Sequence, residues 1–132
     1  MSGFAIAGFD HVAIAVRDLG ASREWYARVL GLKRRFEDEW GEVPSVMGLT
    51  TGAGDSCVAL FPVEGEVQPP PGRDTLAMRH FAWRVDRANF DRAQDHFREL
   101  DIEFESADHG VAHSLYISDP DGHRIEITTY EV

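Results

Sequence analysis

The chain has 132 residues, of which 43% are hydrophobic and 27% are charged, so it has the size and composition of one globular domain with a sizeable core. Its formal net charge of -10 argues against nucleic acid or an anionic membrane surface as the partner, because both attract clustered Lys and Arg. Its apolar runs are far shorter than the roughly 20 residues of a membrane span, and its single cysteine allows no internal disulfide, so we expect a cytoplasmic protein with a small organic ligand.

The first predicted element is a strand at residues 9–16, where hydrophobic residues recur at every second position. The large apolar residues of this strand form one face, and His11, Ala13 and Ala15 form the other. The small alanines on the second face would leave room for a ligand.

A helix follows, with Asp18 as its N-terminal cap, Gly31 as its stop, and apolar residues spaced by three and four positions. The remaining elements of this half are strands at residues 33–36, 45–49 and 56–62. Residues 64–76 contain three consecutive prolines, which cannot join a sheet ladder, so this segment is predicted to be a connector.

Beyond the connector the same order starts again. Residues 79–85 are predicted to form a strand with His80 and Arg84 on one face, and Asp86 or Asn89 begins a second amphipathic helix. Three further strands are predicted, at residues 102–105, 114–118 and 124–130. Both halves therefore follow the order strand, helix, strand, strand, strand, which indicates an internal repeat.

The last strand follows a tight Asp-Pro-Asp-Gly turn at residues 119–122 and carries one acid, Glu126, among β-branched residues. If the acid faces solvent it needs no partner, but if it lines a cavity it must find a cation. The repeat favours the cavity, because His11 and His80 occupy equivalent places in the two halves and lie opposite the large apolar residues of their strands. The counterpart of Glu126 in the first half is Ala59.

Two imidazoles and one carboxylate form a facial ligand set for a divalent metal and leave positions open for a substrate. A single histidine in a strand is more often an ordinary polar residue, but the equivalent placement of two histidines together with an acid points to a metal. We therefore predict His11, His80 and Glu126 as metal ligands. Fe(II), Mn(II), Zn, Ni and Co are all chemically admissible.

Three segments resemble the vicinal oxygen chelate superfamily, which includes glyoxalase, bleomycin resistance protein and type I extradiol dioxygenase. These segments read DHVAIAVRDL from Asp10, RHFA from Arg79 and DPDGHRIE from Asp119. The resemblance extends over essentially the whole chain, and the last segment is its most specific part. It implies the same three metal ligands and a homodimer in which a site can take ligands from two chains.

The fold implied by this resemblance is α+β, with two βαβββ modules in one chain that form an incomplete barrel around a metal site. The modules would span residues 8–63 and 77–132, joined by the connector at residues 64–76.

Departures from the family patterns bear on which member this chain resembles. Glyoxalases carry a fourth ligand, a Glu, where this chain has Ala59, and fosfomycin enzymes carry a Lys and a Ser where it has Ser106 and Gly110. Bleomycin-binding members generally lack the metal ligands. Extradiol dioxygenases therefore give the leading hypothesis, which is an enzyme that binds a small oxygenated substrate through two vicinal oxygens. This resemblance favours Fe(II) among the possible metals.

The dioxygenase pattern places a His five to seven residues before an apolar-Tyr pair, and His109 and Tyr116 fit this spacing. The resemblance implies that Tyr116 forms a hydrogen bond with a substrate oxygen and that His109, or His113 in its place, lies near the substrate hydroxyl. Tyr116 could instead simply fill the cavity, and the two histidines could lie in an exposed loop. We also expect three residues to line the substrate space: Arg84, Ala59 and Ala13. The other interpretation of Arg84 is a surface ion pair.

Dioxygenases of this family use one more His near the end of the first half's last strand, where this chain offers only apolar residues. A non-oxidative lyase or isomerase is therefore the close alternative, followed by a fosfomycin-type transferase. A protein that binds a small molecule or drug without turnover is the alternative from a different class.

Overall fold

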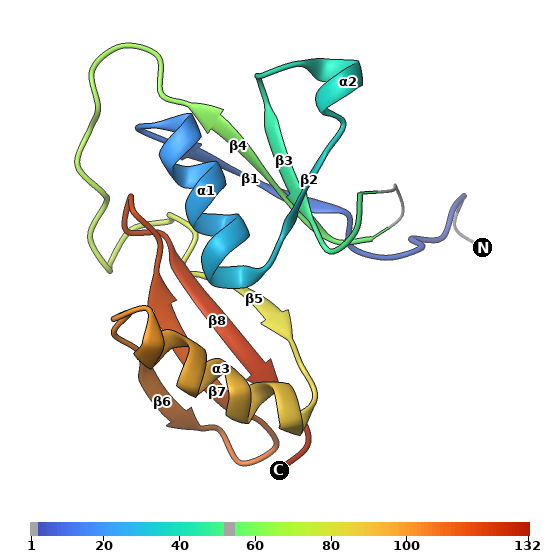
Figure 1. The fold of residues 1–132 in the computed structure, drawn as a ribbon, viewed down its shortest axis with the longest axis vertical. Helices are drawn as coiled ribbons and strands as arrows, with labels where there is room; N and C mark the ends of the chain where they lie inside the picture. Colours follow the sequence, from blue (N-terminus) through green and yellow to red (C-terminus); the bar gives the residue numbers. More distant parts are fainter. Residues whose placement is uncertain (1–2, 52–54) are drawn as a thin grey trace. The chain divides into compact units, whose positions relative to one another are not determined.

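The computed structural model describes residues 3–51 and 55–132, which form two compact units (Figure 1). The first unit ends at Gly65 and the second begins at Glu66. Each unit contains a four-stranded sheet of its own.

The first unit has a mixed sheet with strand order β1-β4-β3-β2. Its first and last strands, β1 and β4, run parallel, and the other neighbouring strands run antiparallel. In chain order its elements are β1 (His11–Val16), α1 (Leu19–Leu30), β2 (Lys33–Arg35), α2 (Glu37–Trp40), β3 (Ser45–Gly48) and β4 (Cys57–Pro62).

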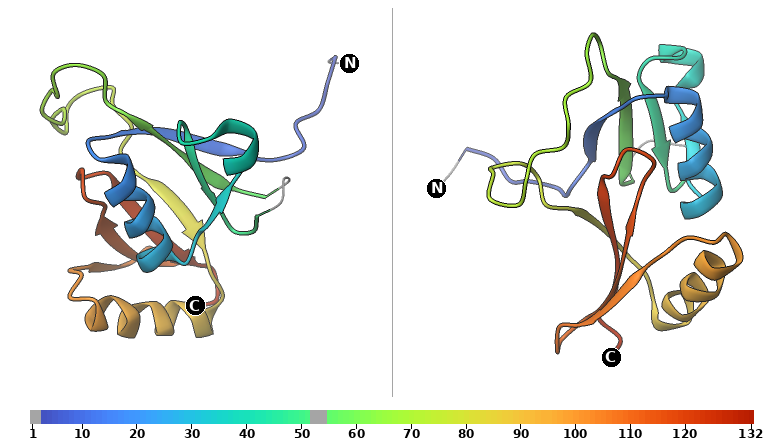
Figure 2. Two further views of the ribbon diagram at one scale, coloured as in Figure 1. Left: turned by 45° about the horizontal axis from the view of Figure 1, so that its top comes forward. Right: turned by 90° about the vertical axis from the view of Figure 1, so that its left-hand side faces the viewer.

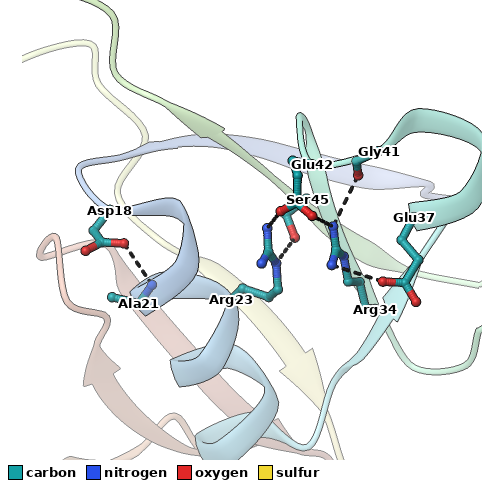
Figure 3. Close-up of polar contacts among 8 residues, drawn as sticks. All are labelled: Asp18, Ala21, Arg23, Arg34, Glu37, Gly41, Glu42 and Ser45. Carbon is teal, nitrogen blue, oxygen red and sulfur yellow. Dashed lines mark hydrogen bonds and ion pairs between the residues drawn. The ribbon is translucent and has the colours of Figure 1, made fainter.

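Helix α1 begins and ends at the residues that the sequence predicts. Asp18 Oδ1 accepts a hydrogen bond from the Ala21 backbone N–H at 3.0 Å (Figure 3), and Gly31 ends the helix in a left-handed conformation with φ of 68°. Tyr26 and Val29 are buried on the side of the helix that packs against β3 and β4. Figure 2 shows the helix lying across one face of this sheet.

Helix α2 is absent from the predicted elements. It is a single turn in the acidic run after β2, and Glu37 at its start pairs with Arg34 Nη1 at 3.0 Å (Figure 3). The chain that follows α2 is fastened to α1, because Arg23 donates to Ser45 Oγ at 2.8 Å and to Glu42 Oε2 at 3.0 Å. These contacts hold the segment between β2 and β3 on the helix side of the sheet.

The second unit repeats this arrangement with strand order β5-β8-β7-β6, in which β5 and β8 run parallel. In chain order its elements are β5 (Phe81–Arg84), α3 (Arg87–Glu99), β6 (Glu105–Asp108), β7 (His113–Ser118) and β8 (Arg124–Thr129). Asp86 caps α3 by accepting from the Asn89 backbone N–H at 2.8 Å. Phe90 and Phe97 are the buried residues of this helix, as its predicted apolar stripe requires.

The strand predicted near residues 102–105 is present as β6, but it begins three residues later than predicted, at Glu105. The Ile102 N–H donates to the Phe97 carbonyl at 2.8 Å, and the ring of Phe104 lies 6.0 Å from the ring of Phe97. These contacts tie the segment to the end of α3. Pairing with β7 therefore starts only at Glu105, which lies opposite Tyr116.

Both units share the order strand, helix, strand, strand, strand, with α2 as an addition in the first. The predicted α+β fold with two βαβββ modules is confirmed. Each sheet remains open, with β1 and β2 at the edges of the first sheet and β5 and β6 at the edges of the second. The predicted arrangement of both modules around a metal stays a prediction.

Candidate functional site

One face of the second sheet carries a row of three side chains, Ala82, Glu126 and Tyr116, which lie side by side in the strand register. Their chain neighbours Ile125 and Leu115 point to the opposite face and are fully buried. We call the face that carries this row the open face. Its strands place three of the predicted site residues, Arg84, Tyr116 and Glu126, close together in the register, and a fourth, His80, directly precedes β5.

Glu126 is the centre of a polar cluster on the open face. It is only 9% exposed, and its two oxygens have different partners. Oε1 lies 3.0 Å from Nε2 of His80, the residue that precedes β5, and Oε2 accepts a hydrogen bond from Ser114 Oγ at 2.5 Å. A carboxylate this buried needs such partners, because an unpaired buried charge is costly.

Tyr116 and His109 extend the cluster. Tyr116 Oη lies 3.0 Å from His109 Nε2, and the ring of Tyr116 meets the ring of His80 edge-on with 5.7 Å between centroids. Burial and the negative charge of Glu126 raise the pKa of the Tyr116 phenol. Tyr116 therefore keeps its proton at neutral pH and can donate a hydrogen bond.

His113 lies on the other face of the sheet. The residues of β7 alternate, so His113 points away from Tyr116, toward α3. Its Nδ1 lies 2.8 Å from Arg87 Nη1, and its ring is 6.5 Å from the ring of Phe90. The structure therefore does not bring His113 to the polar cluster.

Two arginines lie on the open face beside the cluster. Arg84, which is exposed, pairs in register with Thr128. Arg124 places its guanidinium 4.5 Å from the centre of the Tyr116 ring and reaches Glu105 Oε2 at 3.3 Å. Both cations could orient an anionic group of a ligand.

A groove borders Tyr116 and Arg124, where Ile102 and Phe104 form part of its wall. It opens where the chain before β6 follows the end of α3 instead of pairing with β7. The shifted position of β6 thus leaves an accessible depression next to the cluster.

In the first unit, His11 begins β1 and forms a hydrogen bond with the preceding residue. Asp10 Oδ2 lies 2.7 Å from His11 Nδ1. The backbone of Asp10 is itself fixed, because its carbonyl accepts a hydrogen bond from the Cys57 N–H at 3.1 Å. A His held at Nδ1 by a carboxylate presents Nε2 to a metal, which is a common arrangement at metal sites.

Ala13 and Ala59 are neighbours in the register of β1 and β4. Ala13 is exposed, whereas Ala59 is only 5% exposed and packs in a small cluster with Val46 and Cys57. Ala59 therefore contributes to the core of its unit, and Ala13 is the more accessible of the two predicted substrate-lining alanines.

The donor atoms in the second unit suit a divalent ion. Two ligand atoms that each lie about 2.1 Å from an ion, at right angles to each other, are about 3.0 Å apart. His80 Nε2 and Glu126 Oε1 have this separation, which also suits the hydrogen bond that joins them here. Among the described residues, neither unit by itself gathers three His, Cys, Asp or Glu side chains into a metal-binding group.

Asp10, Ser114 and Arg124 are site residues that the sequence predictions omit. A signal for two of them exists in the sequence, because Ser114 and Arg124 lie two residues before Tyr116 and Glu126 and so share their face of the sheet. The contact between Asp10 and His11 has no such signal, since neighbouring residues of a strand normally point to opposite faces.

Comparison with known proteins places these observations in a family context. The family model described as Glyoxalase/Bleomycin resistance protein/Dioxygenase superfamily matches residues 8–127.

No helix in the described part of the chain is both long enough and apolar enough to cross a membrane.

Individual relatives include enzymes with different activities. The chain is 30% identical over 120 residues to biphenyl-2,3-diol 1,2-dioxygenase 3 of Rhodococcus globerulus, an alignment that covers 89% of this chain and 60% of that protein. The structure of a glyoxalase/dioxygenase from Nostoc punctiforme is similar with a TM-score of 0.78 and 26% identity, covering 98% of this chain and 97% of that one. Lactoylglutathione lyase from Agrobacterium tumefaciens has a TM-score of 0.70 and 20% identity, with 94% of each chain covered, and shares the fold.

Proposed function

We propose that this chain, which belongs to the glyoxalase/bleomycin resistance protein/dioxygenase superfamily, is a metal-dependent enzyme that opens the ring of a catechol by extradiol dioxygenation. The observation that carries the proposal is the contact between His109 and Tyr116 beside the pair formed by His80 and Glu126. The dioxygenase resemblance implies this group of side chains.

His11, His80 and Glu126 would hold the metal. When bound, the ion would supply Lewis acidity to the two vicinal oxygens of the substrate, and iron would also supply redox chemistry with oxygen. Asp10 supports this role of His11 because it engages Nδ1 and leaves Nε2 for the ion. In the second unit, Ser114 engages Oε2 of Glu126, and Oε1 lies 3.0 Å from His80 Nε2, so these two donor atoms are placed to bind the same ion.

Tyr116 and His109 would handle the proton of a substrate hydroxyl. The raised pKa of Tyr116 keeps its phenol protonated, so that it can donate a hydrogen bond to a substrate oxygen. His109 Nε2, 3.0 Å from that phenol, is placed to accept a proton. Such general acid-base assistance typically contributes 10² to 10⁴-fold to a rate.

The substrate class follows from the curated relative, whose name specifies an aryl-substituted catechol. The chain spans about 60% of the length of that relative, so its substrate is part of the proposal for this chain. The groove beside Tyr116 has a mixed lining that includes Glu105 and Arg124, and within it Phe104 offers a surface on which the aryl substituent can pack. We therefore expect biphenyl-2,3-diol to be a better substrate than unsubstituted catechol.

The test loads the protein with Fe(II) without oxygen, adds each catechol in air, and records oxygen uptake together with the yellow ring-opened product. We expect Tyr116→Phe and His109→Gln to lower kcat by roughly 10²-fold or more. His113→Gln serves as the matched control, because it removes a histidine from the opposite face. Absence of oxygen uptake by iron-loaded wild-type protein with every catechol would contradict the proposal.

A second candidate function is that of a non-oxidative lyase or isomerase. It is favoured by the absence of a histidine from β4. Where dioxygenases of the family have a further His, this strand has Ala59, Leu60 and Phe61, and the first two are buried. This candidate predicts that protein loaded with Mn(II) or Zn(II) exchanges the α-proton of a 2-hydroxy ketone for deuterium without oxygen. Wild-type protein that takes up none of these metals would instead favour binding without turnover.

A further inference from the structure

Ser114 has no part in the roles proposed above beyond its contact with Glu126, yet it is the most deeply buried polar partner of that acid. It is 0% exposed, and its position on β7 puts it on the open face, opposite Thr128 and diagonal to Glu126. Diagonal neighbours on adjacent strands are close enough for side chains to meet. The pairing of the two strands therefore places the Ser114 hydroxyl next to the Glu126 carboxylate.

The Ser114 hydroxyl has one proton and two nearby acceptors. Glu126 Oε2 lies 2.5 Å from Ser114 Oγ, and Thr128 Oγ1 lies 3.2 Å from it. An ionised carboxylate accepts only, and O–H···O⁻ bonds are typically 2.5–2.7 Å long. Ser114 therefore donates its one proton to Glu126, and the Thr128 hydroxyl donates to the His113 carbonyl at 3.4 Å.

This bond makes the two oxygens of Glu126 unequal. Oε2 is taken by Ser114, and Oε1 is directed toward His80 Nε2 at 3.0 Å. A carboxylate with two unengaged oxygens can bind an ion through both of them, and it then fills a coordination position that a chelating substrate needs.

We propose that Ser114 is a positioning residue that restricts Glu126 to a single metal-binding oxygen, Oε1, and so keeps an adjacent position available to a substrate that binds through two oxygens. The inference rests on the proposed function, since it assigns a role at the same metal site. Ser114 itself touches neither metal nor substrate in this scheme.

The test uses Co(II) as the probe, because its visible absorption reports the number of ligands. Wild-type protein, Ser114→Ala and Ser114→Val are titrated with Co(II) and then with catechol under anaerobic conditions. Ser114→Val also removes the hydroxyl, adds no metal ligand and suits a strand, so it provides a second variant if the alanine variant is poorly folded. Ser106→Ala, an exposed serine on the neighbouring strand and the opposite face, is the matched control.

We expect both Ser114 variants to bind Co(II) with a weaker visible band, which indicates an extra ligand, and to bind catechol at least tenfold more weakly than wild type. Ser106→Ala should match wild type in both measurements. A purely structural role for Ser114 would lower stability without changing the Co(II) spectrum of the folded fraction.

Two results would overturn the inference, and they can be told apart. If wild-type protein binds Co(II) and the Ser114 variants show the same spectrum and the same catechol affinity, Ser114 does not restrict Glu126, while the proposed function survives. If wild-type protein binds no Co(II), the metal site itself is wrong, and the inference is overturned together with the proposed function.

Discussion

At position 57, β4 places a thiol on the same face as Ala59 and buries it. Cys57 is 5% exposed, and burial raises the pKa of its thiol, with only partial opposition from the positive charge of Arg35. The thiolate is the reactive form of cysteine, so a raised pKa and a buried sulfur both slow alkylation.

We expect iodoacetamide at pH 8 to label Cys57 roughly tenfold or more slowly in the folded protein than in urea, as followed by mass spectrometry. Because the unfolded thiol loses its proton at lower pH than the folded one, this residue should also make the protein less stable as pH rises above about 8.5. The Cys57→Ala variant should lack that part of the pH dependence. Equal labelling rates with and without urea would contradict the burial of this thiol.

At two glycines of the first unit, we expect an added side chain to have opposite effects on stability. A Cβ at Gly48 would meet Arg35 Nη2 at 2.8 Å, and Arg35 cannot easily retreat because it is 4% exposed and ion-paired with Asp55. At Gly20, on α1, the nearest atom to an added Cβ is Asp18 Oδ1 at an ordinary 3.6 Å.

Gly48→Ala should therefore lower the free energy of unfolding by about 1–3 kcal/mol, as in other overpacked sites. Gly20→Ala should raise it by up to about 1 kcal/mol, because alanine is the better helix former. Urea denaturation of both variants measures these changes. A Gly48→Ala variant as stable as wild type would show that Arg35 moves aside without cost.

Among the elements, the turn between β7 and β8 sets the position of Glu126. Asp119 is 6% exposed, and its Oδ1 accepts from the backbone N–H groups of Asp121 at 2.9 Å and His123 at 2.8 Å. Gly122 has φ of 87°, a conformation that other residues rarely adopt. The Asp-Pro-Asp-Gly sequence is thus matched to the backbone it forms.

Asp119→Ala should destabilise the protein by about 1–3 kcal/mol, because two backbone donors lose their buried acceptor. Asp119→Asn keeps an oxygen at the same place and should cost clearly less, which makes it the matched control. Thermal unfolding of the two variants provides the comparison. Equal losses would mean that the charge of Asp119, and not its hydrogen bonds, stabilises the turn.

The sequence predicts elements that are fixed by local signals, such as the caps Asp18 and Asp86, the stop at Gly31 and the alternation along β1 and β8. It does not predict the start of β6, because the contact between Phe104 and Phe97 is a tertiary one that overrides strand propensity. It also does not predict α2, which is too short to show a hydrophobic period.

The same distinction applies to the candidate site. Alternation places Tyr116 and Glu126 on one face, so their meeting is predictable once β7 and β8 are paired. The side on which His113 falls follows from the observed start of β7 and its register with Thr129, whereas the sequence left the choice between His109 and His113 open. The bond between Ser114 and Glu126 depends on side-chain rotamers, which no sequence pattern specifies.

At the scale of the whole molecule, the chain consists of two units joined through a long exposed segment. The connector residues from Glu64 to Leu76 contain no helix or strand, and the two units meet in sequence at Gly65 and Glu66. Exposed segments without regular structure are preferred sites of proteolysis, because a protease needs several residues in an extended form.

We expect limited trypsin digestion to cut first after Arg73, which gives fragments of residues 1–73 and 74–132 that mass spectrometry identifies. Arg73→Gln should delay the first cut. Arg92→Gln is the control, because Arg92 is also exposed but lies in α3, where the helix protects the backbone. A first cut within α1 or α3 would contradict the assignment of these elements as the stable parts.

The register of the hairpin formed by β7 and β8 has a consequence for how this chain can change in evolution. Since neighbouring strand residues point to opposite faces, losing or gaining one residue in the turn would move Glu126 to the side of α3 and bring Ile125 or Ile127 to the open face. Insertions and deletions should therefore accumulate among orthologous chains in the proline-rich connector, while the spacing between Tyr116 and Glu126 stays constant. A comparison of segment lengths among orthologous chains would thus distinguish the segments that hold site residues from those that only connect them.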